Sequence, residues 1–307
     1  MGTIIQYLRQ FYTKDFRLFY FIPVIALMGI IIYLNYRYQL QDNLIGDGNN
    51  LWRSFAGYWL LYFVPFAAAF LLQFFFIKNI TWHKSYWFWI ILFLAPAFFS
   101  FRVNFYFHQP LLKHFWSGDE LVFWNNSINR IVKVFILLIP VFIVWYIKDK
   151  DNQLFYGTTA IKDLKPYLLM LLMTAPFVAI ACTRSDFLQT YPDSKFIQQL
   201  SLSSKKIHYI IYELCYGFDF VSIEFFFRGF LILSLYKICG PQCIVPVACF
   251  YCAIHCGKPL GEAISSFWGG IFLGIISYHT KSIWGGLIVH VGIAWIMEAG
   301  SWMSILF

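Results

Sequence analysis

Long apolar runs recur along the whole chain, and short polar stretches separate them. A helix that crosses a membrane needs about 20 predominantly apolar residues, and lipid admits only helices and closed barrels as spanning structures. Several of the runs are short or adjoin one another, so the pattern predicts an all-α polytopic membrane helical bundle with about eight transmembrane helices. The runs lie near residues 18–36, 55–77, 86–101, 131–147, 167–182, 208–221, 224–238, 243–256, 264–279 and 283–299.

The composition supports a membrane protein. Of the 307 residues, 60% are hydrophobic and only 12% are charged, whereas soluble domains carry about 25% charged residues. Arg9, Lys14 and Arg17 precede the first apolar run, and no small-residue cleavage site follows it, which favours a retained first helix over a signal peptide. The net charge of +8 suits anionic membrane lipids as partners, and we expect no nucleic acid partner.

The apolar runs make the protein integral to a membrane. We expect it in a bacterial cytoplasmic (inner) membrane, with an endoplasmic reticulum membrane as the alternative. Basic residues on the two sides of the first 207 residues roughly balance, so the positive-inside rule gives no orientation.

Polar residues are distributed differently in two parts of the chain. Before position 208, all acidic residues lie in predicted tails or loops, Asp42 and Asp47 among them. After it, they lie in or beside apolar runs, together with most of the glycines, which let helices approach closely. We therefore divide the chain into lipid-facing N-terminal helices and loops, 1–207, and a polar-core part, 208–307, that carries the chemistry.

Two charged residues stand in one of the most apolar stretches, "SIEFFFRGFLI". Glu224 and Arg228 are four residues apart, so they share one face of a helix and can pair. A charge surrounded by lipid is costly and usually marks a functional site. The alternative is a structural ion pair that fixes the orientation of the helix.

Two histidines lie in or at the end of later apolar runs. His255 ends "CIVPVACFYCAIH", and His290 is in the middle of "SIWGGLIVHVGIAWIME". A lone intramembrane histidine is more often a packing residue, but two histidines with a glutamate and an arginine from successive helices indicate one cluster. Histidine can pass protons or donate to a developing oxyanion, and a buried glutamate can act as a general base. The set therefore favours activation of water.

The cysteines suggest packing more than chemistry. Cys249, Cys252 and Cys256 fall on one helix face beside His255, so a metal site is conceivable. We prefer buried small apolar residues, because thiolates in a membrane would need a metal to offset their burial. We expect no metal and no cofactor, and the odd number of cysteines argues against a disulfide framework.

Three stretches resemble the CaaX protease and bacteriocin-processing (CPBP) family of intramembrane glutamate-type endopeptidases. Members carry EExxxR, then FxxxH, then HxxxN on successive helices. Here "SIEFFFRGFL" contains Glu224 and Arg228, "YCAIHCGKP" contains Tyr251 and His255, and "SIWGGLIVHVGIA" contains His290. The resemblance implies a CPBP-like helical core whose catalytic residues are Glu224, Arg228, His255 and His290.

The resemblance covers about 208–299 and departs from the family at two positions. Ile223 stands where the family has the first glutamate, which activates water, and Ala294 stands where it has the asparagine, which helps to stabilise the oxyanion. Neighbouring side chains could support the remaining set. These candidates are Asp219, Tyr251, Glu262 and Glu298.

Three functions are compatible with these residues. The first is an endopeptidase that cleaves a membrane-associated peptide or protein with water activated by glutamate and histidine. The second is a catalytically silent family member that serves as a membrane scaffold or partner-binding protein, which Ile223 and Ala294 favour. The third, a proton-coupled carrier, fits less well, because the intramembrane polar residues are all in one half of the chain, whereas such carriers have symmetric repeats.

Overall fold

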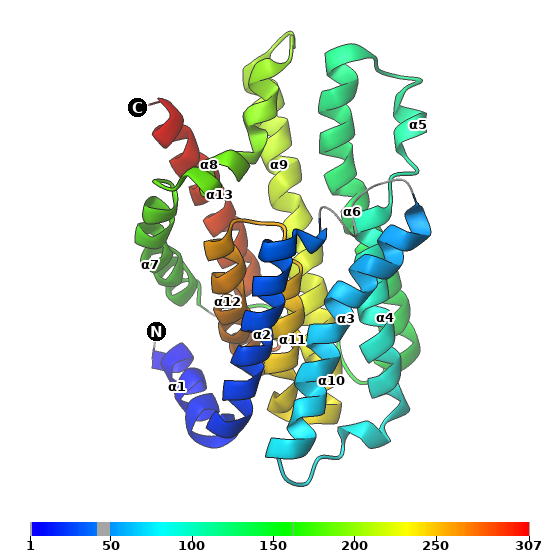
Figure 1. Cartoon of the computed structure of the whole chain (residues 1–307), viewed down its shortest axis with the longest axis vertical. Helices are drawn as coiled ribbons and strands as arrows, with labels where there is room; N and C mark the ends of the chain where they lie inside the picture. Colours follow the sequence, from blue (N-terminus) through cyan, green and yellow to red (C-terminus); the bar gives the residue numbers. More distant parts are fainter. Residues whose placement is uncertain (1, 42–49, 162, 307) are drawn as a thin grey trace.

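The computed structural model describes residues 2–41, 50–161 and 163–306, and 82% of the structure is helical. The described residues form a bundle without strands, which confirms the predicted all-α polytopic membrane fold (Figure 1). The helices are α1 (Gly2–Gln10), η1 (Phe11–Asp15), α2 (Leu18–Tyr38), α3 (Leu51–Phe76), η3 (Trp82–Lys84), α4 (Tyr86–Asn104), α5 (Gln109–Leu112), α6 (Gly118–Lys148), α7 (Lys165–Ala181), α8 (Ser185–Thr190), η4 (Asp193–Gln199), α9 (Lys205–Glu224), η5 (Phe225–Ile232), α10 (Leu233–Cys239), η6 (Gly240–Cys243), α11 (Ile244–Ala253), α12 (Leu260–Thr280) and α13 (Trp284–Leu306).

Seven helical stretches of the described residues are long and apolar enough to cross a membrane, and α7 is a shorter apolar helix. One of the seven, Lys205–Ala253, turns back at Gly240, where φ is +58°. Its first arm runs continuously through α9, η5 and α10, and its second arm is α11 (Figure 1). The runs predicted near 208–221 and 224–238 are therefore parts of one helix. The hydrogen-bond pattern changes from α to π at Phe225, but the chain does not turn there.

The short helix α11 lies at the centre of the bundle. All ten of its residues are buried, and it packs against α3, α12 and η5. Its Phe250 meets the rings of Phe226 and Phe227 with centroids 5.8 Å and 5.2 Å away, both at steep angles. Such edge-on aromatic pairs add stability beyond the apolar area they bury. The core thus fixes α11 against η5, which carries Arg228.

Apolar side chains also cover the outside of the bundle. Phe19, Phe75 and Phe177 are 78%, 79% and 73% exposed. In water an apolar surface of this extent would drive association, whereas acyl chains solvate it. The exposed surface and the seven spanning stretches together make the chain an integral membrane protein.

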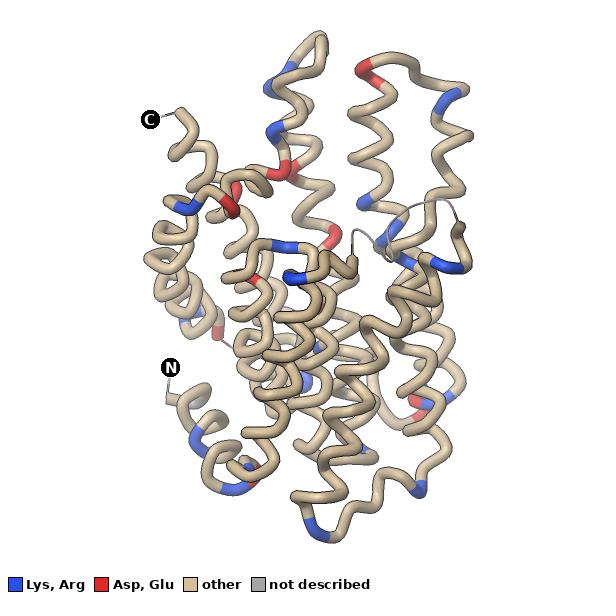
Figure 2. The backbone as a smooth tube through the Cα atoms, viewed as in Figure 1, with Lys and Arg blue, Asp and Glu red and all other residues tan. Residues whose placement is uncertain are grey.

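Charged residues gather towards the two ends of the bundle, with a smaller number inside it (Figure 2). One acidic residue of the N-terminal part, Asp149, is buried and accepts a hydrogen bond of 2.6 Å from Tyr156. Asp149 lies in the turn that follows α6, in a loop as predicted, although its side chain is buried there. Asp42 and Asp47 lie outside the described residues.

Candidate active site

The end of α9 carries the most deeply buried charge pair. Glu224 is the last residue of α9 and is 0% exposed, while Arg228, in η5, is 1% exposed. Arg228 Nη1 lies 3.2 Å from Glu224 Oε1. The helix widens into the π form directly after Glu224, and such wide turns are frequent at functional sites. The predicted i,i+4 pair is present.

His290, from α13, joins this pair. Its Nδ1 lies 2.9 Å from Glu224 Oε1, and its Nε2 lies 3.1 Å from the hydroxyl of Tyr251. The ring of Phe220 packs on the imidazole with centroids 4.5 Å apart. A carboxylate at Nδ1 orients the ring and favours a proton on that nitrogen.

Tyr251, on α11, links His290 to the remaining two residues. Its ring lies 4.1 Å below the Arg228 Cζ, and its carbonyl oxygen is 2.8 Å from His255 Nδ1. A carbonyl can only accept, so Nδ1 of His255 carries a proton and Nε2 of the neutral ring is a base. All four residues predicted as catalytic thus meet around Tyr251.

Helix α2 holds the loop that contains His255. Asn35 Nδ2 donates to the carbonyl oxygen of Cys256 at 2.7 Å, and the Tyr36 hydroxyl donates to that of Lys258 at 2.5 Å. Asn35 is 3% exposed. Sequence reasoning missed both residues, although an asparagine inside the first apolar run was a signal that a polar partner lies nearby.

Several buried polar atoms of the site have no hydrogen-bond partner among the residues that the structure describes. They are Glu224 Oε2 and both terminal guanidinium nitrogens of Arg228. Buried polar groups are almost always satisfied, by protein or by ordered water. The site therefore has unmet capacity to bind water. Gly286 makes this packing possible, because a Cβ there would lie 2.4 Å from Glu224 Oε2.

The two residues that depart from the family motif, Ile223 and Ala294, are apolar and are also buried in the protein. Ile223 is 8% exposed and belongs to the main hydrophobic core. Ala294, one helical turn beyond His290, is 4% exposed. Neither position offers a polar side chain, and no other carboxylate of the described ranges is bonded to Glu224, Arg228 or His290.

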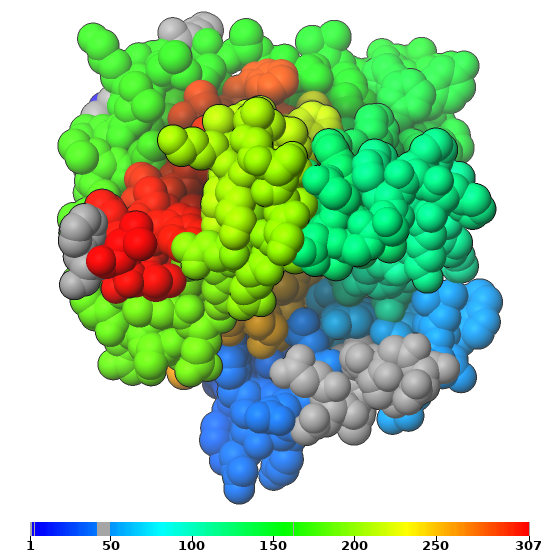
Figure 3. Space-filling model, turned by 90° about the horizontal axis from the view of Figure 1, so that it is seen from above, coloured from blue at the N-terminus to red at the C-terminus, as the bar shows by residue number. Residues whose placement is uncertain are grey.

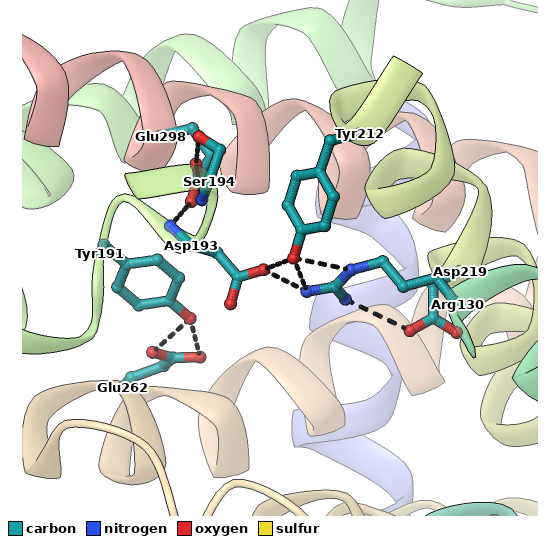
Figure 4. A network of polar contacts seen from close by, with 8 residues as sticks. All are labelled: Arg130, Tyr191, Asp193, Ser194, Tyr212, Asp219, Glu262 and Glu298. Atoms are coloured by element: carbon teal, nitrogen blue, oxygen red, sulfur yellow. Dashed lines mark hydrogen bonds and ion pairs between the residues drawn. The ribbon is translucent and has the colours of Figure 1, made fainter. Parts of the chain in front are cut away.

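The carboxylates considered as supporting residues bind elsewhere (Figure 4). Both oxygens of Glu262 accept from the Tyr191 hydroxyl, at 3.1 Å and 3.0 Å. Glu298 accepts from the backbone N–H groups of Asp193, at 2.6 Å, and of Ser194, at 3.2 Å. Glu262 therefore fastens Tyr191, just before η4, to α12, and Glu298 fastens the first turn of η4 to α13.

Asp219 belongs to the same second network. It pairs with Arg102, and its Oδ2 lies 3.6 Å from Arg130 Nη1. Arg130 also pairs with Asp193, which accepts a hydrogen bond from the Tyr212 hydroxyl (Figure 4). Burial alone would raise the pKa of Asp193, but Arg130 and the Tyr212 hydroxyl together hold that pKa below its ordinary value.

One face of α9 connects the two networks. Tyr212, Tyr216, Phe220 and Glu224 follow each other at intervals of four residues. The Arg130 guanidinium stacks on Tyr216 at 4.5 Å, Tyr216 meets Phe220 at 5.1 Å, and Phe220 packs on the His290 imidazole. Seen from above, the upper end of α9 lies between α6 and the C-terminal helix (Figure 3). This face therefore runs from the Asp193 network to the buried glutamate.

The cysteines are all buried thiols. Cys252 Sγ donates to the Ala263 carbonyl oxygen at 3.1 Å, a packing contact between α11 and α12. In the described ranges, no three His, Cys, Asp or Glu side chains gather closely enough to hold a metal ion.

A family model described as Rce1-like type II CAAX prenyl endopeptidase matches residues 211–296. The matched segment runs from α9 to α13 and contains Glu224, Arg228, His255 and His290. It confirms the resemblance that the three motifs indicated. The searches of curated proteins and of solved structures returned no match to the chain.

Proposed function

We propose that this chain, with its Rce1-like segment in a helical membrane bundle, is an endopeptidase that hydrolyses a membrane-proximal peptide bond. The observation that carries the proposal is the convergence of Glu224, Arg228, His255 and His290 around Tyr251, from three separate parts of the fold. Ionisable groups are too costly inside a membrane to gather without a role.

The proposed chemistry assigns a role to each group. Nε2 of His255 is the base that takes a proton from water, and Glu224, whose Oε2 has no hydrogen-bond partner in the described part of the chain, orients that water. Arg228 lies against Glu224 as its cationic partner, and His290, which binds Glu224 through Nδ1 and faces the Tyr251 hydroxyl through Nε2, completes the polar side of the site on which the scissile carbonyl is bound. Because Glu262 is bound by Tyr191, it has no part in this step.

The apolar residue at 294 is compatible with activity. Removing one oxyanion donor typically lowers the rate by about 10²–10³-fold, which leaves a measurable enzyme. Ile223 is a larger loss, because a carboxylate base is missing there. His255 has to supply the basic function alone, and we therefore expect slow turnover.

The substrate class follows from the site's burial in the membrane. Glu224 and Arg228 are almost fully buried among helices long and apolar enough to cross a membrane, which favours a membrane-associated substrate over a soluble one. A prenylated peptide with a C-terminal CAAX sequence is the first substrate to test, because the matched family is described as acting on this class. The proposed location is a bacterial cytoplasmic membrane, with its lipids as partners.

The test uses the full chain purified in lipid nanodiscs. It is incubated with a farnesylated CAAX peptide and with a panel of peptides that each contain one transmembrane segment, and products are identified by mass spectrometry. We expect slow cleavage that Glu224→Ala and His255→Ala abolish. Equal cleavage by these two variants would assign the activity to a contaminant and end the proposal.

One observation favours a second candidate, a catalytically silent membrane scaffold. Ile223 packs in the apolar core at the position of the family's water-activating glutamate. If the wild type cleaves none of the peptides and Ile223→Glu gains activity, the scaffold function is the correct one. Ile223→Gln, which is similar in size and lacks the charge, is the matched control.

A further inference from the structure

Both ring nitrogens of His290 are engaged inside the protein. Nδ1 faces Glu224 at 2.9 Å, and Nε2 faces the Tyr251 hydroxyl at 3.1 Å. A donor that already has a partner cannot bind a substrate carbonyl without losing that partner. The group at the end of this chain of contacts is the Tyr251 hydroxyl, which can accept one hydrogen bond and donate another.

The surroundings of His290 offer no competing donor from its own helix. Ala294, one turn further along α13, presents only a methyl group, and Phe220 covers one side of the imidazole with an apolar ring. Tyr251, in contrast, lies at the centre of the cluster. Its ring contacts Arg228, and its carbonyl oxygen fixes His255.

We propose that the Tyr251 hydroxyl is a catalytic residue that donates a hydrogen bond to the scissile carbonyl oxygen; this inference rests on the proposed function. In the reacting form, Nδ1–H of His290 donates to Glu224, and Nε2–H donates to the Tyr251 oxygen. The tyrosine proton then points at the substrate. Hydrogen bonds in such a chain polarise and strengthen one another, so the donor becomes stronger as charge develops.

The proton balance of the step leaves Tyr251 unchanged. The oxygen of water adds to the carbonyl carbon, one water proton passes to Nε2 of His255, and the carbonyl electron pair moves to the oxygen that Tyr251 stabilises. When that pair returns, the C–N bond breaks, and the leaving amine takes the proton from His255. The second water hydrogen stays with the new carboxyl group.

The test compares Tyr251→Phe with the wild type, using the peptide that the nanodisc assay identifies. Phenylalanine keeps the ring beneath Arg228 and the carbonyl at His255, so only the hydroxyl is lost. We expect kcat to fall by about 10²–10³-fold with KM changed by less than about twofold, as for loss of one oxyanion donor. Direct donation by His290 predicts the opposite, because removal of the hydroxyl frees Nε2 and kcat is kept or raised.

Tyr20→Phe is the matched control. Tyr20 is 4% exposed and its hydroxyl donates to the Ala69 carbonyl oxygen at 3.0 Å, so this variant also loses a buried tyrosine hydrogen bond. We expect its kcat to stay within about twofold of the wild type. An active wild type with an unimpaired Tyr251→Phe variant overturns this inference alone. A wild type that cleaves no peptide overturns the proposed function and this inference with it.

Discussion

His290 binds Glu224 through Nδ1 at 2.9 Å, which joins the last helix of the bundle to the end of α9. The same carboxylate oxygen lies 3.2 Å from Arg228. Glu224 is therefore the only carboxylate seen at the guanidinium of Arg228 among the described residues, and it is fully buried. Removing its charge should affect both the fold and the chemistry.

Glu224→Gln should destabilise the protein by about 3–5 kcal/mol, because it leaves the guanidinium of Arg228 buried without a counter-charge. Unfolding in detergent can be followed with a thiol-reactive dye, since all seven cysteines are buried in the folded chain. Adding Arg228→Met to Glu224→Gln should restore much of the loss, because an apolar side chain of similar length needs no partner.

Glu120→Gln serves as the control for this charge change. The side chain of Glu120 is 40% exposed and lies 3.6 Å from His208, so its loss should cost less than about 0.5 kcal/mol. If Glu224→Gln is as stable as the control, another group balances the positive charge of Arg228. The pair of Glu224 and Arg228 is then not the electrostatic centre of the site.

The sequence was sufficient to identify the residues of the central cluster. Spacing alone placed Glu224 and Arg228 on one helix face, and the cost of burying charge in lipid indicated that His255 and His290 would join them. The membrane bundle followed from the length of the apolar runs. These inferences succeed because helical periodicity and burial cost act locally along the chain.

The supporting residues could not be identified in this way. Pro259 and the turn before α12 separate Glu262 from His255, so the direction of its side chain depends on the loop conformation. Tyr191 and Asp193 lie in a polar segment that looks like an ordinary loop in sequence, yet they bind residues of α6, α9 and α12. Such contacts depend on tertiary packing, which has no local pattern.

Gly286→Ala should damage the site, because the new Cβ would lie 2.4 Å from Glu224 Oε2. Either the carboxylate or α13 has to move, and overpacking of this kind costs about 1–3 kcal/mol. The displaced carboxylate would no longer hold His290, so peptide cleavage should fall by more than about tenfold. Thermal unfolding and the nanodisc assay measure the two effects separately.

Gly269→Ala is the control for this substitution. Gly269 is also helical, in α12, and a Cβ there would meet nothing within 4 Å. Because alanine is the better helix former by up to about 1 kcal/mol, this variant should be as stable as the wild type or more so. A Gly286→Ala variant that behaves like Gly269→Ala would show that the carboxylate can shift without cost.

Asp193→Asn should weaken the bundle in a pH-dependent way. Its half-buried carboxylate is held by Arg130 and the Tyr212 hydroxyl, and its folded-state pKa is lowered despite the opposing effect of burial. A lowered folded pKa stabilises the protein above the unfolded value of about 3.9, and this contribution disappears as pH falls through the folded pKa. At pH 7 we expect a loss of about 1.5–3 kcal/mol, typical of hydrogen bonds to charged groups.

The pH dependence separates the charge of Asp193 from its packing. Unfolding midpoints of the wild type and Asp193→Asn should differ at pH 7 and pH 5 and converge as pH falls from about 3.9 through the lowered folded-state pKa, because below that pKa the wild-type carboxyl carries a proton and Arg130 loses its partner in both proteins. Asp151→Asn, an exposed carboxylate in the loop after α6, should differ little from the wild type throughout. A constant difference for Asp193→Asn at all pH values would mean that the side chain acts through shape and not through its ion pair.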